Sequence, residues 1–126
     1  MTALIRRAEA RRTATPNATM TTLASPSVGG STSLSLWEVE MKPDQRGPLH
    51  AFDREQLWTV RAGRVTISVD GSEHDLEAGD TLVIPARSER RVLARADAEL
   101  LVCGQADAQA SIPGEGTSRG TPPWIS

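Results

Sequence analysis

Turn signals divide the middle of this sequence into segments too short to form helices. Asp70-Gly71, the dipeptide of two-residue hairpins, ends the β-branched run "RVTISV", and Gly79-Asp80 separates "HDLEA" from "TLVIP". The runs "SLSLWEVEM", "EQLWTVRAG", "ERRVLA" and "AELLVCG" have the same short, β-rich character. Outside the first dozen residues, no window has a convincing 3.6-residue period. This pattern predicts an all-β sandwich or barrel.

The chain length and the distribution of strand signals indicate one domain with two flanking segments. With 126 residues and a mass of 13.5 kDa, the chain can bury one core. Strand signals fill residues 33–103, which we expect to form the barrel, and residues 1–32 are expected to be an N-terminal arm and edge strand. Residues 104–126 are rich in Gly, Pro, Ser and Ala, so we expect an extended C-terminal tail with Trp124-Ile125 as an apolar anchor.

Charge and hydropathy argue against several classes of partner. The net charge is −2 and the isoelectric point about 5.7, so no broad basic field is present to hold nucleic acid. No apolar run approaches the ~20 residues that a membrane helix requires. The Arg-rich start has no apolar signal core, and the single Cys103 excludes an internal disulfide. We therefore expect a cytoplasmic protein that binds neither nucleic acid nor membrane.

Two motifs in residues 33–103 resemble those of the single-domain bacterial cupins, type-2 cupin domains of the RmlC-like superfamily. The first motif of that family is a Gly, then His-x-His, a Glu or Gln, and a closing Gly, and it is matched here by Gly47, His50, Phe52, Gln56 and Gly63. The second motif is matched by Gly79-Asp80, Pro85, Arg87 and Arg90. The resemblance implies a double-stranded β-helix, or jelly-roll, barrel.

The resemblance also implies a place for a metal ion, but the residues found there are poor ligands. Many cupins coordinate a divalent ion with two histidines and a Glu or Gln from the first motif and a histidine from the second. Those places hold His50, Phe52, Gln56 and Arg90. Phenylalanine has no lone pair, and arginine is a cation with donors only. The other histidine, His74, is expected to pair opposite Ile67 near a hairpin end, so we expect no metal cofactor.

Strand alternation predicts what the barrel contains instead. His50 and Phe52 share one face, as do Gln56 and Trp58 on the next strand, and Arg90 is in phase with Val92. Together these six residues would form a concave site for a small organic, anionic ligand, with Arg90 gripping the anion, Gln56 fixing its orientation and the aromatic rings stacking on it. In the alternative reading, Phe52 and Trp58 only fill the barrel, and Arg90 pairs with Glu55, Asp53 or Glu89.

Two other functions remain open from the sequence. His50, whose ordinary pKa is near neutrality, could be the general base of an isomerase, cyclase or lyase, with Asp53 or Glu55 orienting it and Arg90 stabilising an enolate. A metal-dependent cupin that uses His50, Gln56 and borrowed carboxylates is the third reading.

The N-terminal region carries the expectation about association. Residues 13–24 have the pattern of an extra strand without a partner in the minimal barrel. Members of the family that the chain resembles commonly dimerise by lending such a segment to a neighbour's sheet, and open sheet edges favour pairing. We therefore expect a homodimer.

Overall fold

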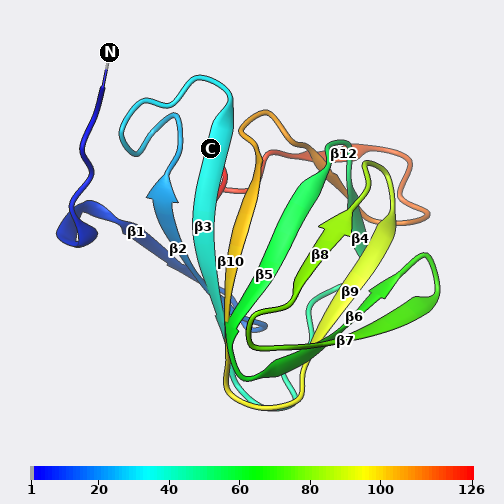
Figure 1. Ribbon diagram of the computed structural model, residues 1–126. Helices are drawn as coiled ribbons and strands as arrows, with labels where there is room; N and C mark the ends of the chain where they lie inside the picture. Colours follow the sequence, from blue (N-terminus) through cyan, green and yellow to red (C-terminus); the bar gives the residue numbers. More distant parts are fainter. Residues whose placement is uncertain (1) are drawn as a thin grey trace.

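Two six-stranded antiparallel sheets pack face to face in the computed structural model, which describes residues 2–126 (Figure 1). The first sheet has the order β1 (Arg11–Ala14), β2 (Thr19–Ala24), β3 (Leu34–Met41), β10 (Ala98–Gln105), β5 (Gln56–Ala62), β8 (Thr81–Ile84). The second has the order β12 (Ser118–Gly120), β11 (Ala110–Ser111), β4 (His50–Phe52), β9 (Glu89–Ala94), β6 (Arg64–Val69), β7 (Ser72–Glu77). The structure confirms the predicted all-β jelly roll.

Helical structure is minimal in the described residues. It consists of one 3₁₀ turn, η1 (Arg7–Glu9), ahead of β1. No helix within residues 2–126 is long and apolar enough to cross a bilayer.

The core forms where inward residues of the two sheets meet, and the predicted alternation is correct for the strands that matter most. On β5, Gln56, Trp58 and Val60 are buried while Leu57 is exposed. On β9, Arg90 and Val92 are buried, and the intervening Arg91 is half-buried. Because side chains alternate along a strand, these two registers decide which chemistry faces the interior.

The hairpin between β6 and β7 has the predicted two-residue turn. Asp70 and Gly71 have φ angles of 48° and 84°, the left-handed values that such a turn requires. The turn sets the register that places His74 opposite Ile67, as predicted. His74 is exposed, and β7 is the outermost strand of its sheet. The chain's second histidine is therefore far in the fold from His50.

The N-terminal segment has a partner in its own chain, which corrects the expectation that it lacks one. β2 pairs with β3 through a register that includes Met20 opposite Val39, and β1 then pairs with β2. Turn signals alone could not show that β3 has a free side available. The homodimer stays a prediction, now without a donated strand as its motive; β1 and β8 are the edges of this sheet.

The C-terminal segment is part of the sandwich rather than only an extended tail. β11 pairs with β4, and β12 pairs with β11, so two short strands extend the second sheet. Ile125 is fully buried, and its carbonyl oxygen accepts a hydrogen bond of 2.5 Å from Ser35 Oγ. In Figure 1 this segment, orange to red, crosses one end of the sandwich and ends beside β3. Strands of two and three residues in a Gly- and Pro-rich stretch carry too little pattern to be predicted.

Gly63 and Gly71 allow a matched test of the turns. Both have left-handed φ angles, 79° and 84°. A Cβ at Gly63 would lie 1.9 Å from Asp97 O, whereas at Gly71 no described residue other than the glycine and its two chain neighbours has an atom within 4 Å of that position. We expect Gly71→Ala to lower the free energy of unfolding by about 1–2 kcal/mol, the cost of the backbone conformation alone. Gly63→Ala should lower it by about 3 kcal/mol or more, because the backbone must also move. Urea unfolding followed by tryptophan fluorescence measures both, and equal losses would contradict the predicted clash.

Candidate functional site

The family's ligand positions converge on one point between the sheets. His50 on β4 lies directly opposite Arg90 on β9. Phe52, two residues after His50, meets its ring edge to face, with centroids 5.2 Å apart and planes at 79°. The Arg90 guanidinium carbon lies 5.3 Å from the Phe52 ring centroid, within cation–π range. Phe52 and Arg90 stand at two positions where the family resemblance implies histidines. The phenyl ring of Phe52 thus packs against the guanidinium of Arg90.

Gln56 completes this group from the facing sheet. Its side chain is buried, and Oε1 accepts hydrogen bonds from Arg90 Nη1 at 3.1 Å and from Trp58 Nε1 at 3.0 Å. Two donors fix the orientation of the amide, since only its oxygen can accept them. Nε2 is buried without a hydrogen-bond partner among residues 2–126. The Gln56 amide oxygen therefore links the Arg90 guanidinium to the Trp58 indole.

Arg90 is a buried cation held by neutral groups. It is 0% exposed, with Nε donating to Ser88 O at 3.1 Å and Nη2 reaching Pro85 O at 3.5 Å. It forms no salt bridge within the described part of the chain, so the alternative pairing with Glu55, Asp53 or Glu89 is absent there. Burial lowers the pKa of Arg90 to about 10, an effect that the nearby Asp70 partly offsets. The side chain remains charged at neutral pH.

These four positions do not fit a metal ion. Gln56 Oε1 is already bonded to two donors, and Phe52 offers no lone pair. A cation placed among them would meet the Arg90 charge in a site with low solvent access. No group of three or more His, Cys, Asp or Glu side chains within residues 2–126 has a geometry that could hold a metal.

A cavity of about 400 Å³ lies beside this cluster, between the two sheets. Four of the six predicted site residues line it, namely His50, Phe52, Trp58 and Val92. Gln56 and Arg90 are not among its lining residues; they lie behind the wall. The geometry thus differs from the expected direct grip by Arg90, because its donors point at Gln56 and at backbone carbonyls.

Much of the cavity wall comes from segments outside the two sequence motifs. Trp37, Val39 and Met41 on β3 and Met20 on β2 line one side. Alternation along residues 33–41 carried a signal for the first three, since they share a face. The C-terminal segment closes another side with Ala110, Ile112, Arg119, Gly120, Pro122, Pro123 and Trp124. Apart from Trp124, which was expected to belong to an apolar anchor, no local pattern marked these residues, because the pairing of β11 with β4 brings this segment to the cavity.

His50 is the one histidine among the described residues that line the cavity, and its hydrogen bond determines which ring nitrogen can act as a base. Nδ1 lies 2.8 Å from Pro48 O, and a carbonyl oxygen only accepts, so Nδ1 carries the proton. Nε2 then has a lone pair, and it has no hydrogen-bond partner in residues 2–126. Burial lowers the pKa of His50 below its ordinary 6.5; the Pro48 hydrogen bond opposes this, and the Arg90 charge adds to it. His50 is neutral at physiological pH, and Nε2 is available as an acceptor or base.

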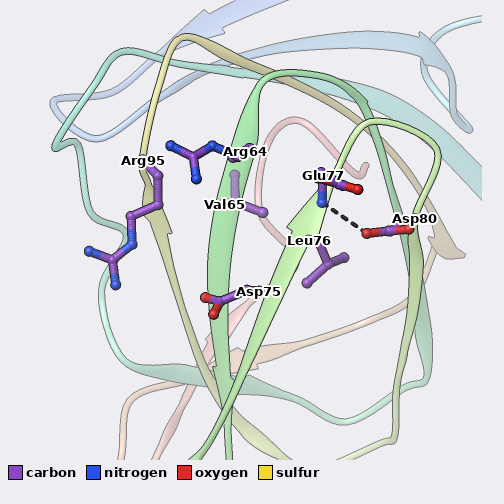
Figure 2. Close-up of a pocket in the computed structure, with 7 residues that line it drawn as sticks. All are labelled: Arg64, Val65, Asp75, Leu76, Glu77, Asp80 and Arg95. Atoms are coloured by element: carbon purple, nitrogen blue, oxygen red, sulfur yellow. Dashed lines mark hydrogen bonds between the residues drawn. The ribbon is translucent and has the colours of Figure 1, made fainter.

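A second hollow, of about 490 Å³, lies along β6 and β7 and is lined mainly by charged residues (Figure 2). In Figure 2, Arg64 and Arg95 lie on one side, and Glu77 and Asp80 on the other. Asp80 Oδ2 accepts from the Glu77 backbone N–H at 2.9 Å, which fixes the turn before β8. Thr66 Oγ1 receives Arg95 Nε and donates to Asp75 Oδ1. The side chains of Asp75, Asp80 and Arg95 are thus hydrogen-bonded within the sheet, and we assign no site here.

The sequence profile of a family described as "Cupin domain" matches residues 37–103, which is more than half of the chain. No curated protein sequence is significantly similar to the chain.

The solved structures that share this fold include proteins with different names and activities. An RmlC-like cupin from Shewanella frigidimarina has 17% identity and a TM-score of 0.67, over 78% of this chain and 85% of that one. KdgF from Halomonas sp. has 17% identity and a TM-score of 0.72, over 83% and 94% of the two chains. Salicylate 1,2-dioxygenase from Pseudoaminobacter salicylatoxidans has 18% identity and a TM-score of 0.72, over 83% of this chain and 31% of that one. At such identities the likeness shows the fold alone.

Whether these side chains disfavour a metal ion can be tested by introducing histidines at positions 52 and 90. We expect Phe52→His combined with Arg90→His to bind Co²⁺ at least ~100-fold more tightly than the wild type, because one opposing unit charge at ~4 Å costs about 4 kcal/mol at an intermediate dielectric. Calorimetric titration and the visible spectrum of bound Co²⁺ measure this. Phe52→His alone is the matched control and should stay weak, since Arg90 remains. Equally tight binding by the wild type would refute the misfit.

Proposed function

This chain belongs to the cupin domain family, and we propose that it is a metal-free member whose barrel cavity binds a small organic, anionic ligand. The observation that carries the proposal is the replacement of the family's cation site by Arg90, which lies buried against Phe52 and Gln56 beside an aromatic cavity. In this proposal the Arg90 guanidinium supplies the positive charge that a bound metal ion would supply in other members, and the neighbouring cavity holds the organic ligand.

The dimensions and walls of the cavity indicate the size of that molecule. About 400 Å³ is near the lower end of the volumes of small-molecule sites, which suits a compound of one or two rings. All three tryptophans of the chain, Trp37, Trp58 and Trp124, line the cavity, together with Phe52. Flat apolar or aromatic compounds stack well on such walls.

The buried charge gives the cavity its preference for anions. Arg90 forms no salt bridge among the described residues, and the nearby Asp70 offsets its charge only in part. At a separation of roughly 7 Å and an effective dielectric of ~20, an anion in the cavity gains about 2 kcal/mol. His50 Nε2 adds an acceptor for a hydroxyl group of the ligand.

Ligand binding can be measured directly, because every tryptophan reports on the cavity. Salicylate and gentisate are suitable probes; gentisate is the compound in the dioxygenase structure with this fold. We expect both acids to change the tryptophan fluorescence and to bind about 10-fold or more tightly than neutral salicylamide. Arg90→Met should reduce that preference, because it removes the buried positive charge beside the cavity.

Two controls make this test specific. His74→Ala alters the exposed histidine and should leave every affinity unchanged. Arg90→Met removes a buried cation, so its folding is checked by circular dichroism. Equal binding of acid and amide by the wild type would remove the anion preference, and stoichiometric metal in protein purified without chelator would remove the metal-free assignment.

A second candidate function, proton transfer, is favoured by the free Nε2 of His50. With its proton held on Nδ1 by Pro48 O, His50 can accept a proton at Nε2 from a carbon next to a carbonyl. The enolate that forms would be stabilised by the positive charge of Arg90 behind Phe52. An isomerase or cyclase could work in this way.

Keto–enol tautomerisation of phenylpyruvate, followed by ultraviolet absorbance, tests this function. His50→Gln should slow the reaction by at least ~100-fold, since glutamine cannot take up the proton. The base must be neutral and its pKa is lowered, so the rate should decline as pH falls, with the midpoint of the decline below pH 6.5. His74→Gln is the matched control. An undiminished rate in His50→Gln would exclude this role.

A further inference from the structure

We propose that Arg119 is the residue that directly contacts the ligand's acidic group, and that Glu115 occupies its place in the free protein. The inference rests on the proposed function and names the ligand class as a small ring compound bearing a carboxylate. Arg119 is the single permanently charged residue among the described residues that line the cavity. Arg90, which the sequence indicated for this role, lies behind the wall.

The contact between Arg119 and Glu115 has the form that a ligand carboxylate would take. Arg119 Nε donates to Glu115 Oε2 at 2.8 Å, and Nη2 donates to Oε1 at 2.6 Å. Such a pair of N–H···O bonds, one to each carboxylate oxygen, is the arrangement by which a guanidinium recognises a carboxylate. The side chains are 60% and 37% exposed, respectively, and an ion pair in such a solvated position contributes little to stability. A ligand can therefore replace Glu115 at small cost.

The backbone around Glu115 is less constrained than the backbone around Arg119. Glu115 lies between Gly114 and Gly116, whose φ angles are 87° and 72°. Apart from the glycine and its two chain neighbours, no described residue has an atom within 4 Å of where either Cβ would be. Arg119 belongs to β12, which is paired with β11 and is followed by Pro122 and Pro123 in the cavity wall. The carboxylate can withdraw into solvent without disturbing packing, while the guanidinium stays at the cavity.

Strand pairing brings β12, the strand that carries Arg119, close to the aromatic walls, and Arg119 is itself a lining residue of the cavity. Ala110 pairs with Phe52 on one side and with Gly120 on the other, so one row crosses β4, β11 and β12. Two strand spacings, roughly 10 Å, then separate the backbone of β12 from that of β4. An acid held by Arg119 could thus place its ring among Phe52, Trp58 and Trp124, all of which line the same cavity.

The test compares variants whose effects have opposite signs. Salicylate and neutral salicylamide are titrated into the full-length protein, and binding is followed by tryptophan fluorescence. Arg119→Gln should weaken salicylate binding by about 10-fold or more. Glu115→Gln should strengthen it about 3-fold or more, because the internal competitor is gone. Salicylamide binding should be the same in all three proteins.

A matched ion pair controls for the change in net charge. Arg54 and Asp107 form an exposed pair with a distance of 2.9 Å, and neither lines the cavity. Arg54→Gln and Asp107→Asn repeat the two charge changes and should leave salicylate binding within 2-fold of the wild type.

The outcomes separate this inference from the function on which it rests. If both probes bind and neither Arg119→Gln nor Glu115→Gln alters the affinity for salicylate, the role of Arg119 is overturned while the binding function stands. If Glu115→Gln weakens salicylate binding, Glu115 supports the site rather than standing in for its ligand. If the wild type binds neither probe, the proposed ligand class and this inference both fail.

Discussion

The interior of this barrel is organised around a guanidinium that has no carboxylate partner among the described residues. Arg90 is fully buried, and its N–H groups are used by Gln56 Oε1 and two backbone carbonyls, while Phe52 covers one side. Leaving a buried cation without hydrogen bonds would cost several kcal/mol, so these neutral acceptors are conditions for the fold itself. The same charge adds to the effect of burial in lowering the pKa of His50, and it is the basis of the proposed preference for an anion over a metal ion.

The cavity depends on the C-terminal segment as much as on the barrel. Ile125 is buried and bonded to Ser35, and this anchor holds Trp124 in the wall. β11 and β12 extend the sheet that carries His50, and they bring Arg119 to the same space. The barrel motifs therefore supply the aromatic rings of Phe52 and Trp58 and the imidazole of His50. The C-terminal segment, outside these motifs, supplies the solvent-exposed guanidinium of Arg119. This division explains how a ligand could exchange with solvent although the inner charge is sealed.

The site was predictable where short-range rules act and not where distant segments meet. Strand alternation correctly predicted that three pairs of residues face the interior: His50 and Phe52, Gln56 and Trp58, and Arg90 and Val92. It could not show that Arg90 and Gln56 satisfy each other behind the cavity wall, since their bond joins strands of different sheets. The pairing of β2 with β3 was missed for a similar reason.

Strand period, turn chemistry and side-chain identity are local properties. The all-β jelly roll, the two-residue turn at Asp70-Gly71 and the presence of Phe52 and Arg90 at two places where the resemblance implies metal ligands therefore follow from the amino-acid sequence. Which polar groups reach the cavity depends on how distant strands pack. A buried donor bonds to whatever acceptor the packing brings near, and Arg119 lies 29 residues beyond Arg90 in the chain. Its place in the cavity wall follows from the pairing of three short strands, for which no neighbouring residue carries a signal.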